Sequence, residues 1–253
     1  MNIPLHEIYV GMLVFTRIGA LLFFMPIFSG KTLPVIVRLG LAFLIAYILY
    51  PFIPNDGTVP AHFLQLLIAE FNEVVVGMMM GFSVQIFFFT IEFAGHILST
   101  EAGLAMSADM NPITDSNAST LGNIFFYFGV LLFFMTSVYQ DVISAFFHSF
   151  QIIPPGDGLA RGYANETLIR ETAQVFVIGI RMAAPVIAIN FIINITFAFL
   201  GKVVPKMNVF MISFAVRILV GLIIIVGSME LITGYMMEQI KDRPRYMLEF
   251  LVP

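Results

Sequence analysis

Long apolar segments dominate this sequence, and each is long enough to cross a lipid bilayer as a helix. About 20 consecutive apolar residues are needed to span the hydrocarbon core in an α-helix. Six such segments are separated by turn-forming clusters of Pro, Gly, Asn, Asp and other small polar residues. They cover approximately residues 5–28, 35–53, 61–98, 121–150, 175–200 and 207–235. The sequence therefore predicts an all-α, polytopic helical membrane protein with about six hydrophobic helices.

The lengths and connections of these segments refine the prediction. Residues 61–98 form a segment much longer than a bilayer requires, so it extends beyond the membrane, bends or contains a break. The last two segments are joined by the short connection 201–206, which predicts an antiparallel helical hairpin. Pro185 is expected to kink the first helix of this hairpin. The mixed stretch 159–171 is compatible with either a surface helix or a loop.

The composition supports a membrane protein and argues against several other classes. Hydrophobic residues make up 59% of the chain and charged residues only 11%, whereas soluble domains carry about 25% charged residues. The net charge of -4 argues against nucleic-acid binding, which needs a basic face. There is no cysteine, and the four histidines lack metal-ligand spacing. We therefore expect no cofactor, no metal and no enzymatic activity.

Charged residues interrupt the apolar segments. A charge at the centre of a membrane helix costs roughly 2.5 to 3.5 kcal/mol on insertion scales, so such residues face protein or water and find partners. A proton or ion pathway is one interpretation, but the scattering of acidic and basic residues favours ion pairs between helices or subunits. The residues expected to be paired are Arg17, Glu70, Glu73, Glu92, Arg181, Arg217 and Glu230, with Asp141 as a further charge.

Two other patterns indicate close helix packing. Asn190 and Asn194 lie one helical turn apart, and interhelical hydrogen bonds from their amides would stabilise packing by about 0.6 to 2 kcal/mol each. Gly77 and Gly81 have the GxxxG spacing that lets two helix backbones approach closely, although this spacing is common in apolar helices.

Residues 99–120, here named the polar loop, are small and polar but include Leu104, Met106, Met110 and Ile113. Irregular backbone at membrane depth is tolerated only where protein or a water-filled cavity surrounds it. Gly103 and Pro112 allow a compact, irregular path. The composition leaves two interpretations open, an ordinary solvent-exposed loop and a re-entrant plug inside a pore.

Several sequence blocks resemble one family of membrane proteins. Each block is modest alone, but they keep their order and spacing over most of the chain. They are residues 34–42 (PVIVRLGLA) after Pro26-Ile27-Phe28; residues 73–77 (EVVVG) with Gly81-Phe82, Ala94-Gly95 and 103–106 (GLAM); and residues 205–210 (PKMNVF) with Gly221. On these blocks the chain resembles the FliR/SctT family of type III export-gate proteins.

This resemblance implies a fold, partners and a location. Residues 1–253 would form a single export-gate domain, with a FliP-like part at 1–165 followed by a FliQ-like hairpin and tail at 166–253. The protein would assemble with FliP-like and FliQ-like subunits and an FlhB-like protein, and would pass unfolded substrates across the bacterial inner membrane at the flagellar basal body. Energy would come from elsewhere, so no active site is needed.

The resemblance also assigns the polar loop as the pore plug. The residues expected to plug or gate the pore are Gly103, Leu104, Met106, Met110, Asn111, Pro112 and Ile113. The family has Asp before this proline and the present chain has Asn111, which weakens any ion-pair role at that position.

Three alternatives stay open. The injectisome counterpart SctT shares fold and mechanism but exports virulence effectors; the Asn208-Val209-Phe210 block favours the flagellar member. A small-solute secondary transporter would need broken helices at the midplane and usually internal repeats, which the sequence does not show. A scaffold without pore contact is the third.

Overall fold

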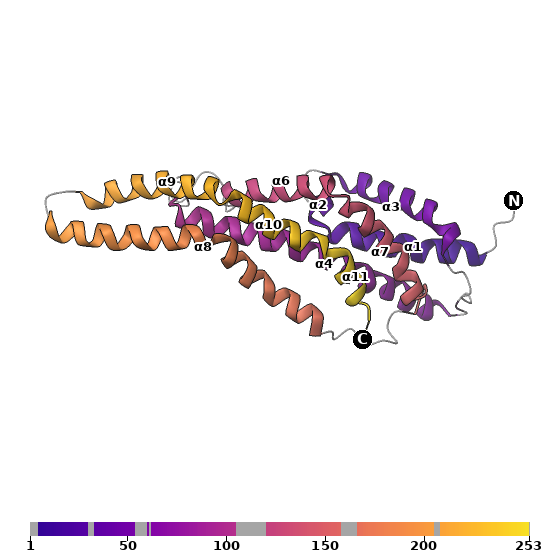
Figure 1. The fold of residues 1–253 in the computed structure, drawn as a ribbon. Helices are drawn as coiled ribbons and strands as arrows, with labels where there is room; N and C mark the ends of the chain where they lie inside the picture. Colours follow the sequence, from indigo (N-terminus) through magenta and orange to yellow (C-terminus); the bar gives the residue numbers. More distant parts are fainter. Residues whose placement is uncertain are drawn as a thin grey trace. The chain divides into compact units, whose positions relative to one another are not determined.

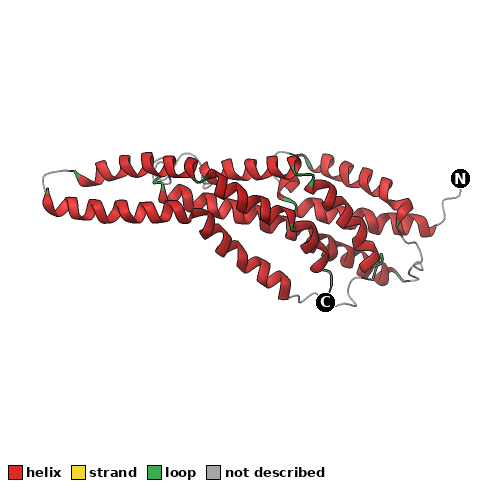
Figure 2. Cartoon of the chain, viewed as in Figure 1, coloured by secondary structure: helices red, strands yellow, loops and turns green. Residues whose placement is uncertain are grey.

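The described part of the chain is helical and contains no strand (Figures 1 and 2). The computed structural model describes residues 5–29, 33–53, 60, 62–104, 120–157, 166–204 and 208–252. Within these residues, five helices are long and apolar enough to cross a membrane, or up to six if one bent pair forms a single span. The predicted all-α, polytopic architecture is confirmed. The helices are α1 (Leu5–Phe24), α2 (Pro26–Ser29), α3 (Val35–Leu49), the 3₁₀ turn η1 (Tyr50–Phe52), α4 (Phe63–Glu101), α6 (Thr120–Met135), α7 (Val138–Ile152), α8 (Glu166–Val203), α9 (Val209–Gly227), α10 (Met229–Lys241) and α11 (Arg243–Glu249).

The chain forms two compact units, each built from separate stretches of sequence. Unit 1 comprises Met1–Phe87, Phe133–Thr172 and Ile240–Pro253. Unit 2 comprises Phe88–Leu132 and Ala173–Gln239. The predicted division into a part before residue 166 and a hairpin after it is a division by family resemblance, and it stays a prediction.

The third apolar segment is one unbroken helix. Helix α4 runs for 39 residues, which at about 1.5 Å per residue is roughly 58 Å of helix. That is nearly twice the ~30 Å thickness of the hydrocarbon core. The sequence left three possibilities open for this segment: extension beyond the membrane, a bend or a break. Because α4 is continuous, a break is excluded.

The fourth segment is not the single helix that the sequence predicts. It is broken between α6 and α7, which bend by 72° relative to each other. Ser137 at the break has φ 61°, the left-handed conformation that side-chain-bearing residues rarely adopt. No Gly or Pro marks this position, so nothing in the sequence signalled the break.

The end of the chain also differs in detail. Helix α8 begins at Glu166, so the stretch before the fifth segment is partly helical, and Pro185 lies inside the helix. The sixth segment is divided at Ser228, where α9 ends and α10 begins.

Within unit 2, α8 and α9 run side by side (Figure 1), and the Arg217 side chain donates to the Asn194 amide oxygen. The predicted antiparallel hairpin is confirmed.

The glycines of the predicted GxxxG spacing lie where α4 meets α1 in unit 1. A Cβ atom on Gly77 would come within 2.3 Å of the Arg17 carbonyl oxygen. On Gly81 it would lie 2.6 Å from the Phe24 Cβ and 2.8 Å from the Leu21 carbonyl oxygen. Such contacts are too short for any side chain, so the predicted close approach of two helix backbones is confirmed.

Candidate functional site at the root of the polar loop

The root of the polar loop, residues 99–104, is described, and it is held in a defined conformation. The Leu104 amide donates to the Ser99 carbonyl oxygen at 2.9 Å, and the Gly103 amide donates to the Thr100 carbonyl oxygen at 3.1 Å. Gly103 has φ 75°. These two bonds and the left-handed glycine form a Schellman motif, which satisfies the last carbonyl groups of α4.

Of the residues predicted to plug or gate the pore, Gly103 and Leu104 belong to this root. Gly103 is buried and Leu104 is half-buried. The other predicted plug residues, Met106, Met110, Asn111, Pro112 and Ile113, lie outside the described residues. The plug assignment stays a prediction.

Helix α9 packs directly against the loop root. A Cβ atom on Gly103 would lie 3.5 to 3.7 Å from side-chain atoms of Arg217, Phe214 and Ile218. One turn further along α9, Gly221 is so close to Ala102 that an added Cβ would lie 2.9 Å from the Ala102 Cβ. The end of α4 is thus fixed on the second helix of the hairpin within unit 2.

Helix α8 contributes two amides to the same region. The Asn190 amide nitrogen donates to the Glu101 carboxylate, and Arg217 donates to the Asn194 amide oxygen. Both amides therefore take part in the predicted interhelical hydrogen bonds, but each pairs with a charged side chain rather than with another amide. Hydrogen bonds to charged groups contribute about 1.5 to 3 kcal/mol. Glu101 was not singled out from the sequence, because it falls in the polar loop as one more polar residue among many.

This polar cluster, defined as Glu101, Asn190, Asn194 and Arg217, retains capacity for further hydrogen bonds. The Asn190 side-chain oxygen and the Arg217 Nε are buried and have no hydrogen-bond partner among the described residues. Buried polar atoms normally find a partner. The cluster therefore offers one acceptor and one donor beside the start of the polar loop.

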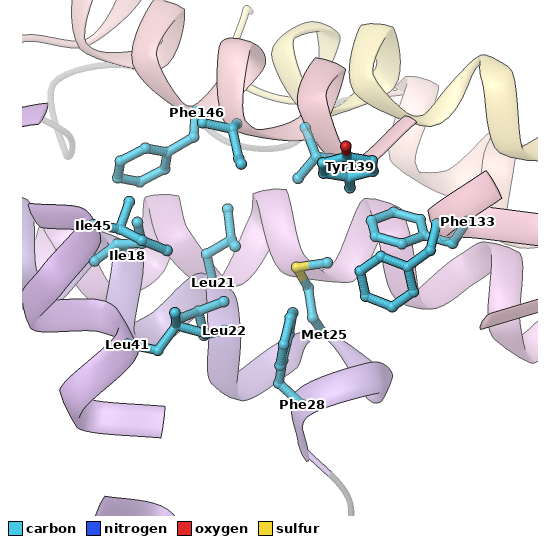
Figure 3. Close-up of a pocket in the computed structure, with 13 residues that line it drawn as sticks. Ile18, Leu21, Leu22, Met25, Phe28, Leu41, Ile45, Phe133, Tyr139 and Phe146 are labelled. Atoms are coloured by element: carbon cyan, nitrogen blue, oxygen red, sulfur yellow. The ribbon is translucent and has the colours of Figure 1, made fainter. Parts of the chain in front are cut away.

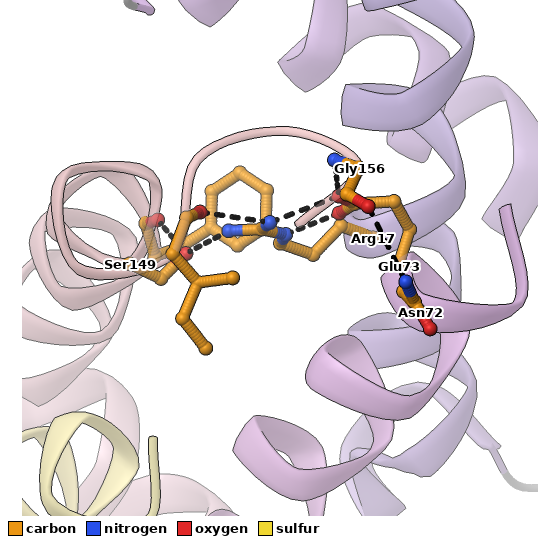
Figure 4. A network of polar contacts seen from close by, with 7 residues as sticks. Arg17, Asn72, Glu73, Ser149 and Gly156 are labelled. Carbon is orange, nitrogen blue, oxygen red and sulfur yellow. Dashed lines mark hydrogen bonds and ion pairs between the residues drawn. The ribbon is translucent and has the colours of Figure 1, made fainter. Parts of the chain in front are cut away.

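A second polar network lies inside unit 1 (Figure 4). Arg17 on α1 forms an ion pair with Glu73 on α4, and both side chains are 0% exposed. The Arg17 Nη2 donates to a Glu73 oxygen at 3.0 Å and to the Ile153 carbonyl oxygen at 3.1 Å. Its Nη1 donates to the Ser149 hydroxyl at 3.1 Å, and its guanidinium carbon lies 3.9 Å from the centre of the Phe150 ring. The network joins α1, α4 and the end of α7.

The same carboxylate holds the turn that follows α7. The Gly156 amide donates to the Glu73 carboxylate at 2.8 Å, and the Asn72 amide donates to the Gly156 carbonyl oxygen at 3.3 Å. Gly156 has φ 88°, as a tight turn closed by the Asp157-to-Pro154 backbone bond requires. The Arg17–Glu73 pair is therefore a structural centre of unit 1.

A second buried ion pair was missed by the sequence interpretation. Arg243 on α11 and Glu171 on α8, both in unit 1, lie 3.1 Å apart and are each 1% exposed. Burial lowers the pKa of Arg243, and the neighbouring Glu171 carboxylate partly offsets this effect. In the sequence, Arg243 falls in the tail of the chain beside Lys241 and Arg245, and no pattern identifies Glu171 as its partner.

The remaining charges that were expected to be paired occupy different environments. Glu70 is half-buried, whereas Glu92, Arg181 and Glu230 are exposed in the single chain. Their pairing, between helices or with neighbouring subunits, stays a prediction. Among the described residues, no group of three or more His, Asp or Glu side chains could hold a metal ion.

Comparisons with known proteins find similarity to one family over nearly the whole chain. The model of the family described as "Bacterial export proteins, family 1" matches residues 8–242. The flagellar biosynthetic protein FliR of Caulobacter vibrioides is 28% identical over 225 residues, which cover 88% of this chain and 90% of that protein. The protein of the same name in Escherichia coli is 26% identical, covering 87% of this chain and 84% of its own length. The Yop proteins translocation protein T of Yersinia pestis is 24% identical, with 87% of this chain and 86% of that protein covered.

Proposed function

The chain belongs to the bacterial export proteins, family 1, and we propose that it is a subunit of the channel through which unfolded flagellar proteins leave the cytoplasm. Its membership confirms the resemblance inferred from the sequence blocks, and it makes the chain a multi-pass membrane component of a type III export apparatus. The finer steps of the proposal concern the partners, the location and the polar loop.

The partners are FliP-like and FliQ-like subunits that complete the channel, together with an FlhB-like protein. The single chain leaves many large side chains exposed on its apolar helices, including Ile36 at 82%, Tyr47 at 73% and Val226 at 75%. Lipid and sister subunits are the two environments that such surfaces suit. The assembly would reside in the bacterial inner membrane at the flagellar basal body, and the injectisome remains the alternative.

The polar loop is the part of the chain that closes the resting channel. The observation that carries this proposal is the fixed loop root, in which Gly103 is held against α9 beside a buried donor and a buried acceptor. A loop anchored at its root can move as a unit about that root, while its tip opens or closes the channel. In the closed state, the Asn190 side-chain oxygen would accept a hydrogen bond from a backbone N–H of the loop, and the Arg217 Nε would donate one to a backbone carbonyl oxygen of the loop.

The apolar side chains of the loop provide the seal. Leu104, Met106, Met110 and Ile113 are large enough to exclude hydrated ions when they meet at the channel axis. Methionine side chains are unbranched and polarizable, so they adapt to one another in the closed state and to a passing polypeptide in the open state. No chemical step is required of the chain, because the work of export is supplied by other parts of the apparatus.

The test is ion conductance through the assembled gate in a planar bilayer. Deleting residues 106–116 is expected to raise the leak conductance, and so is the double change Met106→Ala with Met110→Ala. The matched control is Met135→Ala, which removes a methionine side chain that is 72% exposed on α6. Unchanged conductance in both loop variants would eliminate the plug assignment while leaving the family assignment intact.

A further inference from the structure

Unit 1 contains a cavity of about 230 Å³ whose lining is apolar (Figure 3). Its walls come from the last turns of α1, from Phe28 on α2, from Leu41 and Ile45 on α3, and from residues on both sides of the α6–α7 break. The lining residues include Leu21 and Leu22 on α1 and Met25 directly after it, and those around the break include Phe133, Tyr139 and Phe146.

One wall of this space is formed at the break between α6 and α7. The chain bends at Ser137, and side chains from both sides of the break, among them Phe133 and Tyr139, line the cavity. An apolar cavity does not hold water, and one of about 150 Å³ accepts a molecule as large as benzene. The cavity in unit 1 therefore has room for a longer stretch of hydrocarbon.

The cavity extends from one end of two candidate membrane spans toward their middle. Residues 25–34 connect the α1 span to the α3 span, so in a bilayer this connection would lie at one membrane face. The lining residues on α1 fall in its second half, Leu41 and Ile45 lie around the middle of α3, and Met25 and Phe28 belong to the connection itself. The cavity is thus at the depth of an acyl chain whose headgroup lies at that face.

A cation on α3 lies between the start of the helix and the cavity-lining residue Leu41. Arg38 precedes the lining residue Leu41 by three positions on α3, which places the two on the same face of the helix one turn apart. Its guanidinium carbon lies 5.1 Å from the centre of the Phe23 ring, and its Nε and Nη2 donate to the Leu33 carbonyl oxygen at 3.2 and 3.0 Å. A guanidinium presents five N–H donors in a fork that suits phosphate.

We propose that this cavity binds one acyl chain of an anionic phospholipid from the surrounding bilayer, with Arg38 beside the headgroup phosphate. The apolar lining selects hydrocarbon, and the cation one turn away selects a negatively charged headgroup. The bound lipid fills the space left by the bend at Ser137 and supports α7, which carries Ser149 and Phe150 of the Arg17–Glu73 network. This inference is independent of the proposed channel function.

The absence of tryptophan from the chain allows a direct test. A single tryptophan introduced as Phe28→Trp reports from the cavity, and one introduced as Ile36→Trp reports from a position that is 82% exposed on α3. The full-length protein in detergent micelles is titrated with phosphatidylglycerol that carries brominated acyl chains, which quench tryptophan fluorescence. The cavity tryptophan is expected to reach half-maximal quenching at a lipid mole fraction at least tenfold lower than the exposed one.

Two further variants distinguish the contribution of the cavity to lipid binding from that of Arg38. Val142→Phe, made in the Phe28→Trp background, fills the cavity and is expected to move its quenching curve to that of the exposed tryptophan. Arg38→Gln is expected to weaken quenching by brominated phosphatidylglycerol several-fold and to leave quenching by brominated phosphatidylcholine unchanged. Circular dichroism establishes that each variant is folded before it is titrated.

The outcomes that overturn the proposal are equally specific. Equal quenching curves for the cavity and exposed tryptophans would mean that no lipid is bound specifically. Quenching in the isolated chain that disappears in the assembled gate would assign the cavity to a side chain of a neighbouring subunit. Persistence of the saturable quenching in the assembled gate supports a resident lipid.

Discussion

Replacement of Glu73 by alanine is expected to destabilise unit 1 more than any exposed substitution in the chain. The Glu73 carboxylate accepts hydrogen bonds from Arg17 and from the Gly156 amide, and both charged side chains are completely buried. Removing one partner of a buried ion pair costs about 3 to 5 kcal/mol, because the other charge is left uncompensated. Arg17 would keep the Ser149 hydroxyl, the Ile153 carbonyl and the Phe150 ring, so we expect a loss near the lower limit.

The measurement is equilibrium unfolding of the purified chain in mixed micelles, followed by circular dichroism as the fraction of denaturing detergent is raised. The double variant Arg17→Met with Glu73→Leu removes both charges and keeps much of the volume. It is expected to lose far less stability than the two single changes added together, because apolar replacement of a whole buried pair is often nearly neutral. The control is Arg245→Ala, which removes an exposed Arg–Glu pair on α11 and is expected to change nothing measurable.

Two results would refute this reasoning. An unchanged unfolding midpoint for Glu73→Ala would show that the pair contributes nothing to the fold. A double variant that loses the full sum of the single changes would show that Arg17 and Glu73 act independently, despite the geometry that joins them.

Four smaller changes test other parts of the fold. Gly77→Ala forces a Cβ to within 2.3 Å of the α1 backbone and is expected to cost about 1 to 3 kcal/mol in unfolding free energy; Gly40→Ala, in open space on α3, should instead stabilise by up to about 1 kcal/mol. Gly103→Ala places a side chain at φ 75° and is expected to cost about 1 to 2 kcal/mol and to raise protease cleavage in the polar loop. Burial, the largest cause, raises the pKa of Tyr246 above its ordinary value of 10.0, so the neutral phenol is favoured in the folded state. The stability that this group contributes is present below pH 10 and is lost as pH rises through the pKa of the folded state. Tyr246→Phe is therefore expected to make the free energy of unfolding depend less on pH in that range.

The existence of the apolar helices could be predicted from the sequence, because a long uninterrupted run of apolar residues has few other ways to satisfy its backbone in a membrane. The breaks could not. Ser137 lies at the bend between α6 and α7 without a neighbouring Gly or Pro, so no residue type in this stretch predicts its left-handed conformation.

The polar contacts show the same division between local and long-range information. The end of α4 at Gly103 follows from a rule that acts within a few residues, because only glycine adopts a positive φ at little cost. The partners of Arg17, Asn190 and Arg243 lie 56, 89 and 72 positions away along the chain. Nothing in a single sequence specifies which of several distant carboxylates reaches which cation, so these pairs depend on the fold.

The most direct measurement of the central proposal is a density map of the complex formed when this chain is co-expressed with its FliP-like and FliQ-like partners. We predict one continuous channel with residues 105–119 inside it, and with the loop root held against α9 by Gly103 and Gly221. A map in which these residues lie on the outer surface, or in which no such complex forms, would contradict the assignment of this chain as the plugged subunit of an export gate.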